Sequence, residues 1–430
     1  MALVRTQARD CPVARSFLRT VAARGALALA AIAACGCRAF YGRSIELNPL
    51  GRGRGLAAES VSEVLALDEK EIDIGRAALL VAREDRPGLD IASYLGRLDE
   101  LAARLARRLP ARVSVRRAVE ETARLLRVHG DRSPPARRRR PEPASEAHEA
   151  ASGGLPAEMD LSRILDGDRG NCLGLTLLYL AVAERAGLPL AGVAAPEHYF
   201  VRFDDGVTRV NMELTQGGRA VPDGDYIRSR RISREAIDRG IYLRSESKRQ
   251  VIASLLSNRA ALRALAGRFE EALADAERAL AVKPYWPQGL VNRGLALELS
   301  GRAREAERDY LRALELDPHC ASALNNLAAL YLTRATEGRA GGPAGRAAGR
   351  APSGHPPAGP EEAGALLESA FRMAERAVSL APARPEFHET AAACAAAIGE
   401  RRAARRWLRR AIQLAPGEPR YAEALERLED

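Results

Sequence analysis

Residues 166–189 read DGDRGNCLGLTLLYLAVAERAGLP, and this stretch decides the fold of the first half of the chain. Its Gly- and Asp-rich beginning breaks any preceding helix, and its apolar residues then recur at helical spacing. Gly187 followed by Pro189 predicts the end of the new helix. The sequence therefore predicts a helix that begins at about Cys172.

Cys172 lies at the start of this helix, where either Asn171 or Asp168 could cap the first turn. Free N–H groups and the positive end of the helix dipole favour a thiolate at such a position. Because the thiolate is the nucleophilic form of cysteine, we expect a reactive side chain here. The alternative interpretation is a small buried apolar side chain, which is the commoner role of a single cysteine.

After Pro189 the apolar period changes to that of β-strands. The sequence predicts strands at Leu190–Ala195, His198–Asp204 and Val207–Glu213. Asp205 and Gly206 predict a two-residue hairpin turn, which would pair Asp204 with Val207.

This turn sets the register of the hairpin. It pairs His198 with Glu213 and Phe200 with Asn211, and directly paired residues have Cβ atoms about 4.5–5.5 Å apart. A carboxylate at that distance holds an imidazole in one tautomer and stabilises its charged form. The alternative is that His198 is a purely structural strand residue.

A cysteine at a helix start and a His–carboxylate pair on a hairpin are the components of a cysteine acyl-transferase or hydrolase. The candidate catalytic residues are therefore Cys172, His198 and Glu213. The cysteine spacing fits no zinc site, and the sequence predicts neither a metal nor a cofactor.

The same region resembles the transglutaminase-like core superfamily. The resemblance rests on four stretches, GNCLGL at 170–175, GLP at 187–189, PEHYFVR at 196–202 and NMELT at 211–215. It implies a papain-like α+β core in which Cys172 is the nucleophile and His198 the base. The third member of the family's triad, usually Asp before Pro, falls on Glu213, and Glu197 stands where relatives often carry glycine.

An internal repeat of 34 residues follows, in residues 251–430. Prolines separated by this period occur twice, as Pro284 with Pro318 and as Pro382 with Pro416. Small residues recur at fixed offsets before the prolines, because closely crossing helices leave no room for larger side chains. The period resembles that of tetratricopeptide repeats. A Gly-, Pro- and Ala-rich stretch at about 337–360 is predicted as a disordered insert within the third unit.

Residues 1–34 predict an export signal, because arginines precede the apolar stretch Gly25–Ala34. About ten apolar residues are too few to span a membrane. Residues 32–35, IAAC, resemble the lipobox of bacterial lipoproteins, which implies that Cys35 becomes an acylated N-terminus. We expect an exported, membrane-anchored lipoprotein of a bacterial cell envelope that faces the periplasm. An ordinary cleaved signal is the alternative.

Composition and charge limit the partners. The 430 residues are 47% hydrophobic and 28% charged, which excludes a wholly disordered or collagen-like chain. The net charge of +10 does not outline a nucleic-acid-binding domain, because residues 1–34 hold +4 and Arg137–Arg140 another +4. We expect no nucleic-acid partner. Arg137–Arg140 is interpreted as a solvated tether or, alternatively, as attracted to anionic lipid head groups.

The predicted fold class is α+β, with an all-α solenoid behind it. The predicted segments are an export signal at 1–34, a helical lead-in at 57–128, a disordered insert at 129–159, a transglutaminase-like core at 160–245 and tetratricopeptide repeats at 251–430. The hypothesis is acyl transfer at an amide, with a protein or peptide partner in the repeat groove. The alternative is a non-catalytic assembly scaffold with a relic core, since some relatives lack the cysteine.

Overall fold

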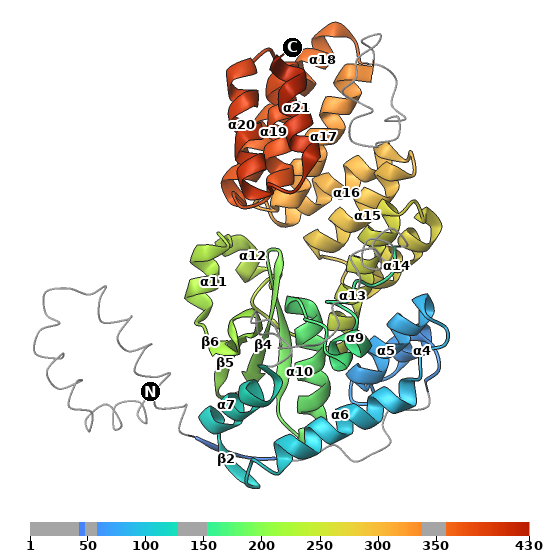
Figure 1. Ribbon diagram of the computed structural model, residues 1–430, viewed down its shortest axis with the longest axis vertical. Coiled ribbons are helices and arrows are strands. Elements are labelled where there is room, and N and C mark those ends of the chain that lie inside the picture. The colour runs from blue at the N-terminus through green and yellow to red at the C-terminus, as the bar shows by residue number, and fades with distance from the viewer. Residues whose placement is uncertain (1–42, 48–57, 128–152, 338–357, 430) are drawn as a thin grey trace, which may run out of the picture.

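The computed structural model joins an α+β part to a stack of paired helices (Figure 1). It describes residues 43–47, 58–127, 153–337 and 358–429. The predicted α+β class is confirmed by this arrangement. The predicted signal, Cys35 and Arg137–Arg140 lie outside the described residues. Across the described ranges, no helix is long and apolar enough to cross a membrane.

The lead-in is helical, as the apolar spacing predicts. Its helices are α4 (Val61–Ala66), α5 (Ile74–Asp85), α6 (Ile91–Ala106) and α7 (Val115–Leu126). Each begins at a Ser or Asp whose side chain accepts a hydrogen bond from the backbone N–H three residues on. A short antiparallel pair, β1 (Ser44–Glu46) with β2 (Arg112–Ser114), was not predicted.

The core places a helix against a five-stranded antiparallel sheet. The elements are α9 (Leu161–Asp166), α10 (Cys172–Ala186), β3 (Leu190–Ala195), β4 (His198–Asp204), β5 (Arg209–Glu213), β6 (Arg219–Ala220) and β7 (Ser245–Glu246). The strand order is β6-β5-β4-β3-β7. Val201 and Phe203 of β4 join the apolar cluster of α10, while Phe200 points to the other face. That face carries α11 (Asp223–Ser229) and α12 (Arg234–Asp238).

The turn between β4 and β5 differs from the prediction. Asp204 pairs with Arg209, so the predicted two-residue turn is wrong and a four-residue loop joins the strands. The cause is the side chain of Asp205, whose Oδ1 accepts hydrogen bonds from the backbone N–H groups of Val207, at 3.0 Å, and Thr208, at 2.6 Å.

The longer loop shifts the register by two residues. Asn211 therefore pairs with Arg202, and the predicted pairing with Phe200 is wrong. In this register Glu213 falls opposite Phe200 and is the diagonal neighbour of His198, so their predicted direct pairing is also wrong. A shift of two residues leaves every side chain on its predicted face.

The predicted insert at 129–159 ends earlier than expected. Residues 153–159 belong to the described structure, and Leu155 and Met159 are buried in the main apolar cluster. The composition of the segment is polar, but these two apolar side chains give its last residues a place in the core.

The solenoid consists of four helix pairs and a final helix within the described residues, as the 34-residue period predicts. The helices are α13 (Lys248–Leu265), α14 (Phe269–Val282), α15 (Pro287–Leu299), α16 (Ala303–Leu316), α17 (Ala321–Glu337), α18 (Pro360–Leu380), α19 (Pro385–Ala397), α20 (Arg401–Leu414) and α21 (Pro419–Glu429). Small residues are needed at the crossings: a Cβ on Gly294 would lie 2.5 Å from the Tyr310 ring.

Helix α13 belongs to both parts of the molecule. Val251, Ile252 and Leu255 are fully buried in the same apolar cluster as α10. On its other side α13 packs against α14 as the first repeat pair. The solenoid therefore begins inside the core of the α+β part.

A buried ionic network fixes this junction. The guanidinium of Arg259 donates to both oxygens of Asp275, at 2.7 and 2.9 Å, and both side chains are fully buried. Arg263 donates to Asp275 at 2.7 Å and to Asp85 of α5 at 2.8 Å. Arg259 also donates to the carbonyl oxygen of Val81 at 2.7 Å. The network joins α5, α13 and α14.

Candidate active site

The start of α10 positions Cys172. Asn171 is the residue that caps it, since its Oδ1 accepts hydrogen bonds from the N–H groups of Leu173 and Gly174, both at 3.0 Å. A side chain at Gly174 is excluded, because a Cβ there would lie 2.1 Å from the carbonyl oxygen of Glu158. The same carbonyl accepts the Asn171 N–H at 2.9 Å, so the segment before α9 clamps the helix start.

The N–H groups at this helix start are partly in use. Those of Leu173 and Gly174 donate to the cap, and the N–H groups of Leu173 and Tyr199 help to lower the pKa of the Cys172 thiol. Among the hydrogen bonds of the described residues, none engages the N–H of Cys172 itself. This N–H is therefore the backbone donor left for a substrate oxygen.

The imidazole and the carboxylate meet across the hairpin. His198 Nε2 lies 2.6 Å from Glu213 Oε2, and both side chains are almost fully buried. A diagonal pair of residues is about 7–8 Å apart between backbones, a distance that long side chains can bridge. Glu213 therefore reaches His198 although the two are not directly paired.

The Glu213 carboxylate is held by two residues that were not predicted from the sequence. Tyr226 donates its hydroxyl hydrogen to Glu213 Oε2 at 2.9 Å, and Thr215 donates to Oε1 from its hydroxyl at 2.6 Å. Tyr226 also stacks on Phe200, with ring centroids 4.1 Å apart. The spacing Glu-Leu-Thr offers a signal for Thr215, because a side chain two residues on can cap a carboxylate locally. Tyr226 comes from α11, and no local pattern points to it.

The pKa values of the three groups are coupled. Burial raises the pKa of Cys172, but the hydrogen bond and charge of His198 outweigh burial and leave it below its ordinary value of 9.0. Burial lowers the pKa of His198, yet Cys172 and Glu213 together raise it to about 9. Burial likewise opposes ionisation of Glu213, but His198, Thr215 and Tyr226 bring its pKa to about 2.

These directions favour a thiolate beside an imidazolium at neutral pH. Because Nε2 of His198 faces Glu213, Nδ1 is the ring nitrogen left for the sulfur. Cys172 is half-buried, whereas Cys320 and Cys394 are buried. Burial raises the pKa of Cys320 to about 12, so its environment opposes the thiolate. In the part of the chain that is described, His, Cys, Asp and Glu side chains form no group able to hold a metal ion.

Glu197 links this site to the solenoid. Its φ of 52° lies in the left-handed region that favours glycine. Its carboxylate accepts a hydrogen bond from Ser322 Oγ at 2.9 Å and lies 3.6 Å from Arg384 Nη1. Ser322 belongs to α17 and Arg384 precedes α19, so the repeats hold the residue before His198. Sequence reasoning noted the departure from glycine but not these partners.

Comparison with known families agrees with this architecture. Residues 150–276 match the model of the transglutaminase-like superfamily, and residues 287–320 match a tetratricopeptide repeat. The chain therefore contains a transglutaminase-like domain followed by tetratricopeptide repeats, as its sequence predicts.

Among curated proteins, the chain is similar to the UPF0162 proteins of two Xylella fastidiosa strains, Temecula1 and 9a5c. It is 32% identical to each over 149 residues, which is 33% of this chain and 52% of the relative. The chain thus spans about half the length of these relatives.

Three solved structures are also similar. MamA from Desulfovibrio magneticus RS-1 is 19% identical, with a TM-score of 0.30 over 41% of this chain and 83% of that one. A thermophilic tetratricopeptide repeat protein of Thermus thermophilus is 21% identical, with a TM-score of 0.33 over 41% and 80%. Menin is 13% identical, with a TM-score of 0.45 over 86% and 92%.

Proposed function

We propose that the protein is a cysteine acyl-transferase or hydrolase that acts on amide bonds. Cys172 is the nucleophile, His198 the acid and base, and Glu213 the group that orients His198. The observation that carries the proposal is the 2.6 Å hydrogen bond between His198 and Glu213, beside a cysteine whose pKa His198 lowers. Burial of the carboxylate with a full set of donors supports the same assignment.

The reaction proceeds in two halves. The thiolate of Cys172 attacks the carbonyl carbon, and the N–H of Cys172 donates to the oxygen that becomes negative. When the tetrahedral intermediate collapses, the C–N bond breaks and the leaving amine takes the proton of the His198 imidazolium. Water or a second amine then attacks the thioester and passes a proton to His198. The thiolate leaves, and the starting ion pair is restored.

The test uses p-nitrophenyl acetate, an activated ester that needs no protonated leaving group. Wild type should release one equivalent of p-nitrophenolate in a burst and carry an acetyl group on Cys172. His198→Ala should slow this burst by about 10²–10⁴-fold, the usual contribution of a general base. His319→Ala, which changes a histidine of the α16–α17 loop, is the matched control. Equal rates of acetylation or iodoacetamide labelling in wild type and His198→Ala would refute activation of the thiol.

The fate of the acetyl group separates hydrolysis from cross-linking. Adding a fluorescent primary amine to the acylated protein yields an acetylated amine when the site accepts amines, and free acetate when it accepts water. Both products leave the triad assignment intact, because Cys172 and His198 act identically in the two cases.

A second candidate function is binding of a protein partner by the solenoid. Tetratricopeptide repeats support a protein-interaction role, and the repeat pairs extend from α13 to α20. On the non-catalytic alternative, the partner binds equally well to wild type and to Cys172→Ala, and no acetyl group accumulates on wild type. The two functions are compatible, because Glu197 connects the repeats to the residue beside His198.

We also propose that Cys35 is acylated and that the protein is held at a membrane of the cell envelope. The lipobox-like stretch before Cys35 supports this.

A further inference from the structure

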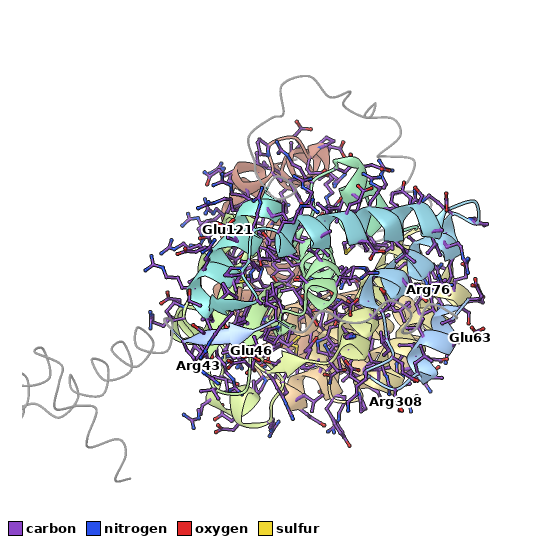
Figure 2. All side chains as sticks on the ribbon, turned by 90° about the horizontal axis from the view of Figure 1, so that it is seen from below. Arg43, Glu46, Glu63, Arg76, Glu121 and Arg308 are labelled. Carbon is purple, nitrogen blue, oxygen red and sulfur yellow. The ribbon has the colours of Figure 1, made fainter. Side chains whose placement is uncertain are left out.

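A concentrated positive charge lies at one end of the molecule. Residues 101–127 carry eight arginines and two glutamates, a net charge of +6, whereas the described residues as a whole hold equal numbers of basic and acidic side chains. All eight side chains are exposed: Arg104, Arg107, Arg108, Arg112, Arg116, Arg117, Arg124 and Arg127. Figure 2 looks onto this end, where Arg43, Glu46 and Glu121 are labelled. We call residues 101–127 the basic surface.

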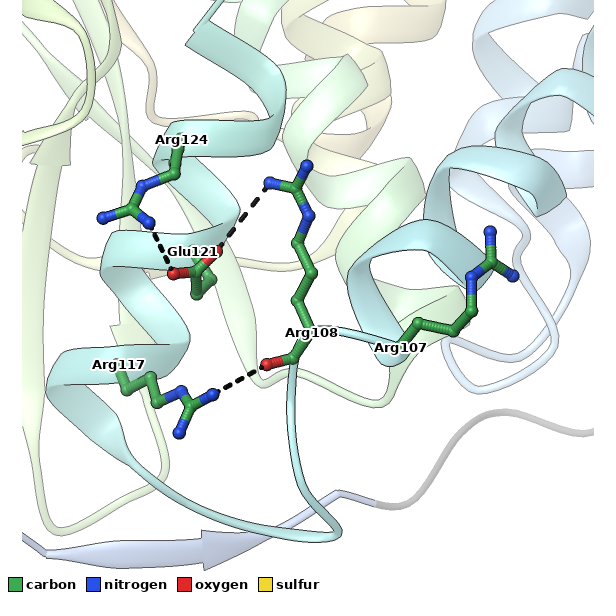
Figure 3. Close-up of a pocket in the computed structure, with 5 residues that line it drawn as sticks. All are labelled: Arg107, Arg108, Arg117, Glu121 and Arg124. Carbon is green, nitrogen blue, oxygen red and sulfur yellow. Dashed lines mark hydrogen bonds and ion pairs between the residues drawn. The ribbon is translucent and has the colours of Figure 1, made fainter.

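A pocket of about 430 Å³ lies within the basic surface, between the end of α6 and α7 (Figure 3). Four arginines and Glu121 line it, so its net charge is +3. Glu121 lies 3.1 Å from Arg124 and 3.8 Å from Arg108, and Arg117 donates to the carbonyl oxygen of Arg108 at 3.2 Å. One carboxylate thus serves two guanidiniums, and Arg107 pairs with no described carboxylate. The pocket has capacity for a further anion.

The N-terminal part of the chain enters the described structure at this surface. Strand β1 pairs with β2, and β2 lies inside the basic segment. Cys35 precedes Arg43 by eight residues. Because a residue spans at most about 3.3–3.6 Å, an acyl chain on Cys35 would lie within about 30 Å of β1. The anchor therefore brings the basic surface, rather than the solenoid, toward the lipid.

We propose that the basic surface docks on anionic phospholipid head groups of the membrane that holds the anchor. Guanidinium groups bind phosphate oxygens in pairs, and arginines near an anionic leaflet are drawn to its surface potential. This inference rests on the proposed acylation of Cys35 for its location. It gives the tether a defined orientation, with the C-terminal repeats at the end of the molecule farthest from the lipid (Figure 1).

The test measures vesicle binding at low ionic strength. The full chain carries Cys35→Ser in every variant and is mixed with vesicles of phosphatidylcholine alone or with added phosphatidylglycerol. A triple variant, Arg107→Gln, Arg117→Gln and Arg124→Gln, should bind the anionic vesicles about 10²-fold more weakly, since each arginine contributes roughly fivefold.

The matched control removes the same charge elsewhere. Arg401→Gln, Arg402→Gln and Arg406→Gln change three exposed arginines of α20, at the opposite end of the molecule (Figure 1). This variant should bind like wild type. Both variants should keep the thermal midpoint of unfolding and the iodoacetamide reactivity of Cys172, which establishes that they are folded.

Three outcomes overturn the proposal. Equal loss in the two triple variants would mean that net charge alone drives binding. Equal binding to neutral and anionic vesicles would mean that head-group charge is irrelevant. No binding to anionic vesicles, together with calorimetric binding of inorganic phosphate that the Arg107, Arg117 and Arg124 triple variant loses, would assign the pocket to a soluble anion.

The anchor is tested separately, by metabolic labelling with an alkyne fatty acid and comparison with Cys35→Ser. If Cys35 is acylated but the triple arginine variant binds vesicles as well as wild type, docking by the basic surface is refuted and the lipid anchor is retained. Arginine-dependent binding without acylation would support docking and refute the anchor.

Discussion

Two regions of this molecule bury charged side chains, and they treat those charges differently. In the network of Arg259, Arg263 and Asp275, both arginines donate to Asp275 and all three side chains are buried. At the triad, Glu213 accepts hydrogen bonds from Tyr226 and Thr215 and lies 2.6 Å from His198, and the nucleophile beside them, Cys172, is only half-buried. These ion pairs connect α13 and α14, the two helices of the first repeat, to each other. At the triad, the exposed part of Cys172 leaves the thiol accessible to a substrate, so a proton can pass between the thiol and His198.

The largest effect is expected in the closed network. Asp275→Ala removes the one fully buried carboxylate of Arg259 and Arg263 and leaves Asp85 as the acidic partner that they share. This should lower the free energy of unfolding by about 3 kcal/mol, the lower end of the range for breaking a buried ion pair. Glu305→Ala is the control, because it removes an exposed partner of Arg302 and should cost less than about 1 kcal/mol. Chemical denaturation measures both. Equal losses would mean that the buried network contributes no more than a surface pair.

The triad should respond to pH as well as to substitution. Glu213→Gln removes the carboxylate that His198, Tyr226 and Thr215 contact, at a cost of about 1.5–3 kcal/mol for a hydrogen bond to a charged group. The pKa of Glu213 falls from 4.5 to about 2 on folding, so this contribution is complete above pH 4.5.

The contribution is lost as the pH falls through about 2, because the carboxylate is then protonated in both states. The measurement is the difference in unfolding free energy between wild type and Glu213→Gln, followed from neutral pH to the acid limit. A difference that stays constant below pH 4.5 would contradict the assigned ionisation of Glu213.

The smallest effect is expected at Glu197. Two replacements of this residue separate the cost of its backbone strain from the loss of its side-chain contacts. Both Glu197→Ala and Glu197→Gly lose Ser322 and Arg384, but glycine accepts the φ of 52° without the cost of about 1–2 kcal/mol that a Cβ incurs. The glycine variant should therefore be more stable than the alanine variant by about that amount. Thermal unfolding of the two proteins measures the difference, and equal stability would show that the turn relaxes in both.

The sequence predicts what local chemistry determines. The start of α10 follows from the Gly- and Asp-rich break and the Asn171 cap, and the helix pairs follow from the repeated small residues and prolines. The hairpin register could not be predicted, because the Asp205 side chain selects a longer loop than the Asp-Gly pair implies. The arrangement of His198 and Glu213 survived this error, since a shift of two residues preserves the face.

Contacts between distant segments were beyond the sequence. Tyr226 reaches Glu213 from α11, and Ser322 reaches Glu197 from a helix more than a hundred residues away. No periodicity in the sequence predicts these contacts, because they depend on how α11 and the solenoid pack on the sheet. The basic surface is different again: its arginines are plain in the sequence, but β1 and β2 had to be paired before the N-terminal part of the chain could be traced to it.

Helix α13 is shared by the α+β part and the solenoid, and this has a consequence for how the two can be recombined in evolution. A recombination event that separated the repeats from the α+β part just before residue 251 would remove Val251, Ile252 and Leu255 from the cluster around α10 and expose apolar surface on both products. Descendants that keep the cysteine helix must therefore keep at least the first repeat helix. Later repeats can be gained or lost at the far end of the stack without touching that shared interior.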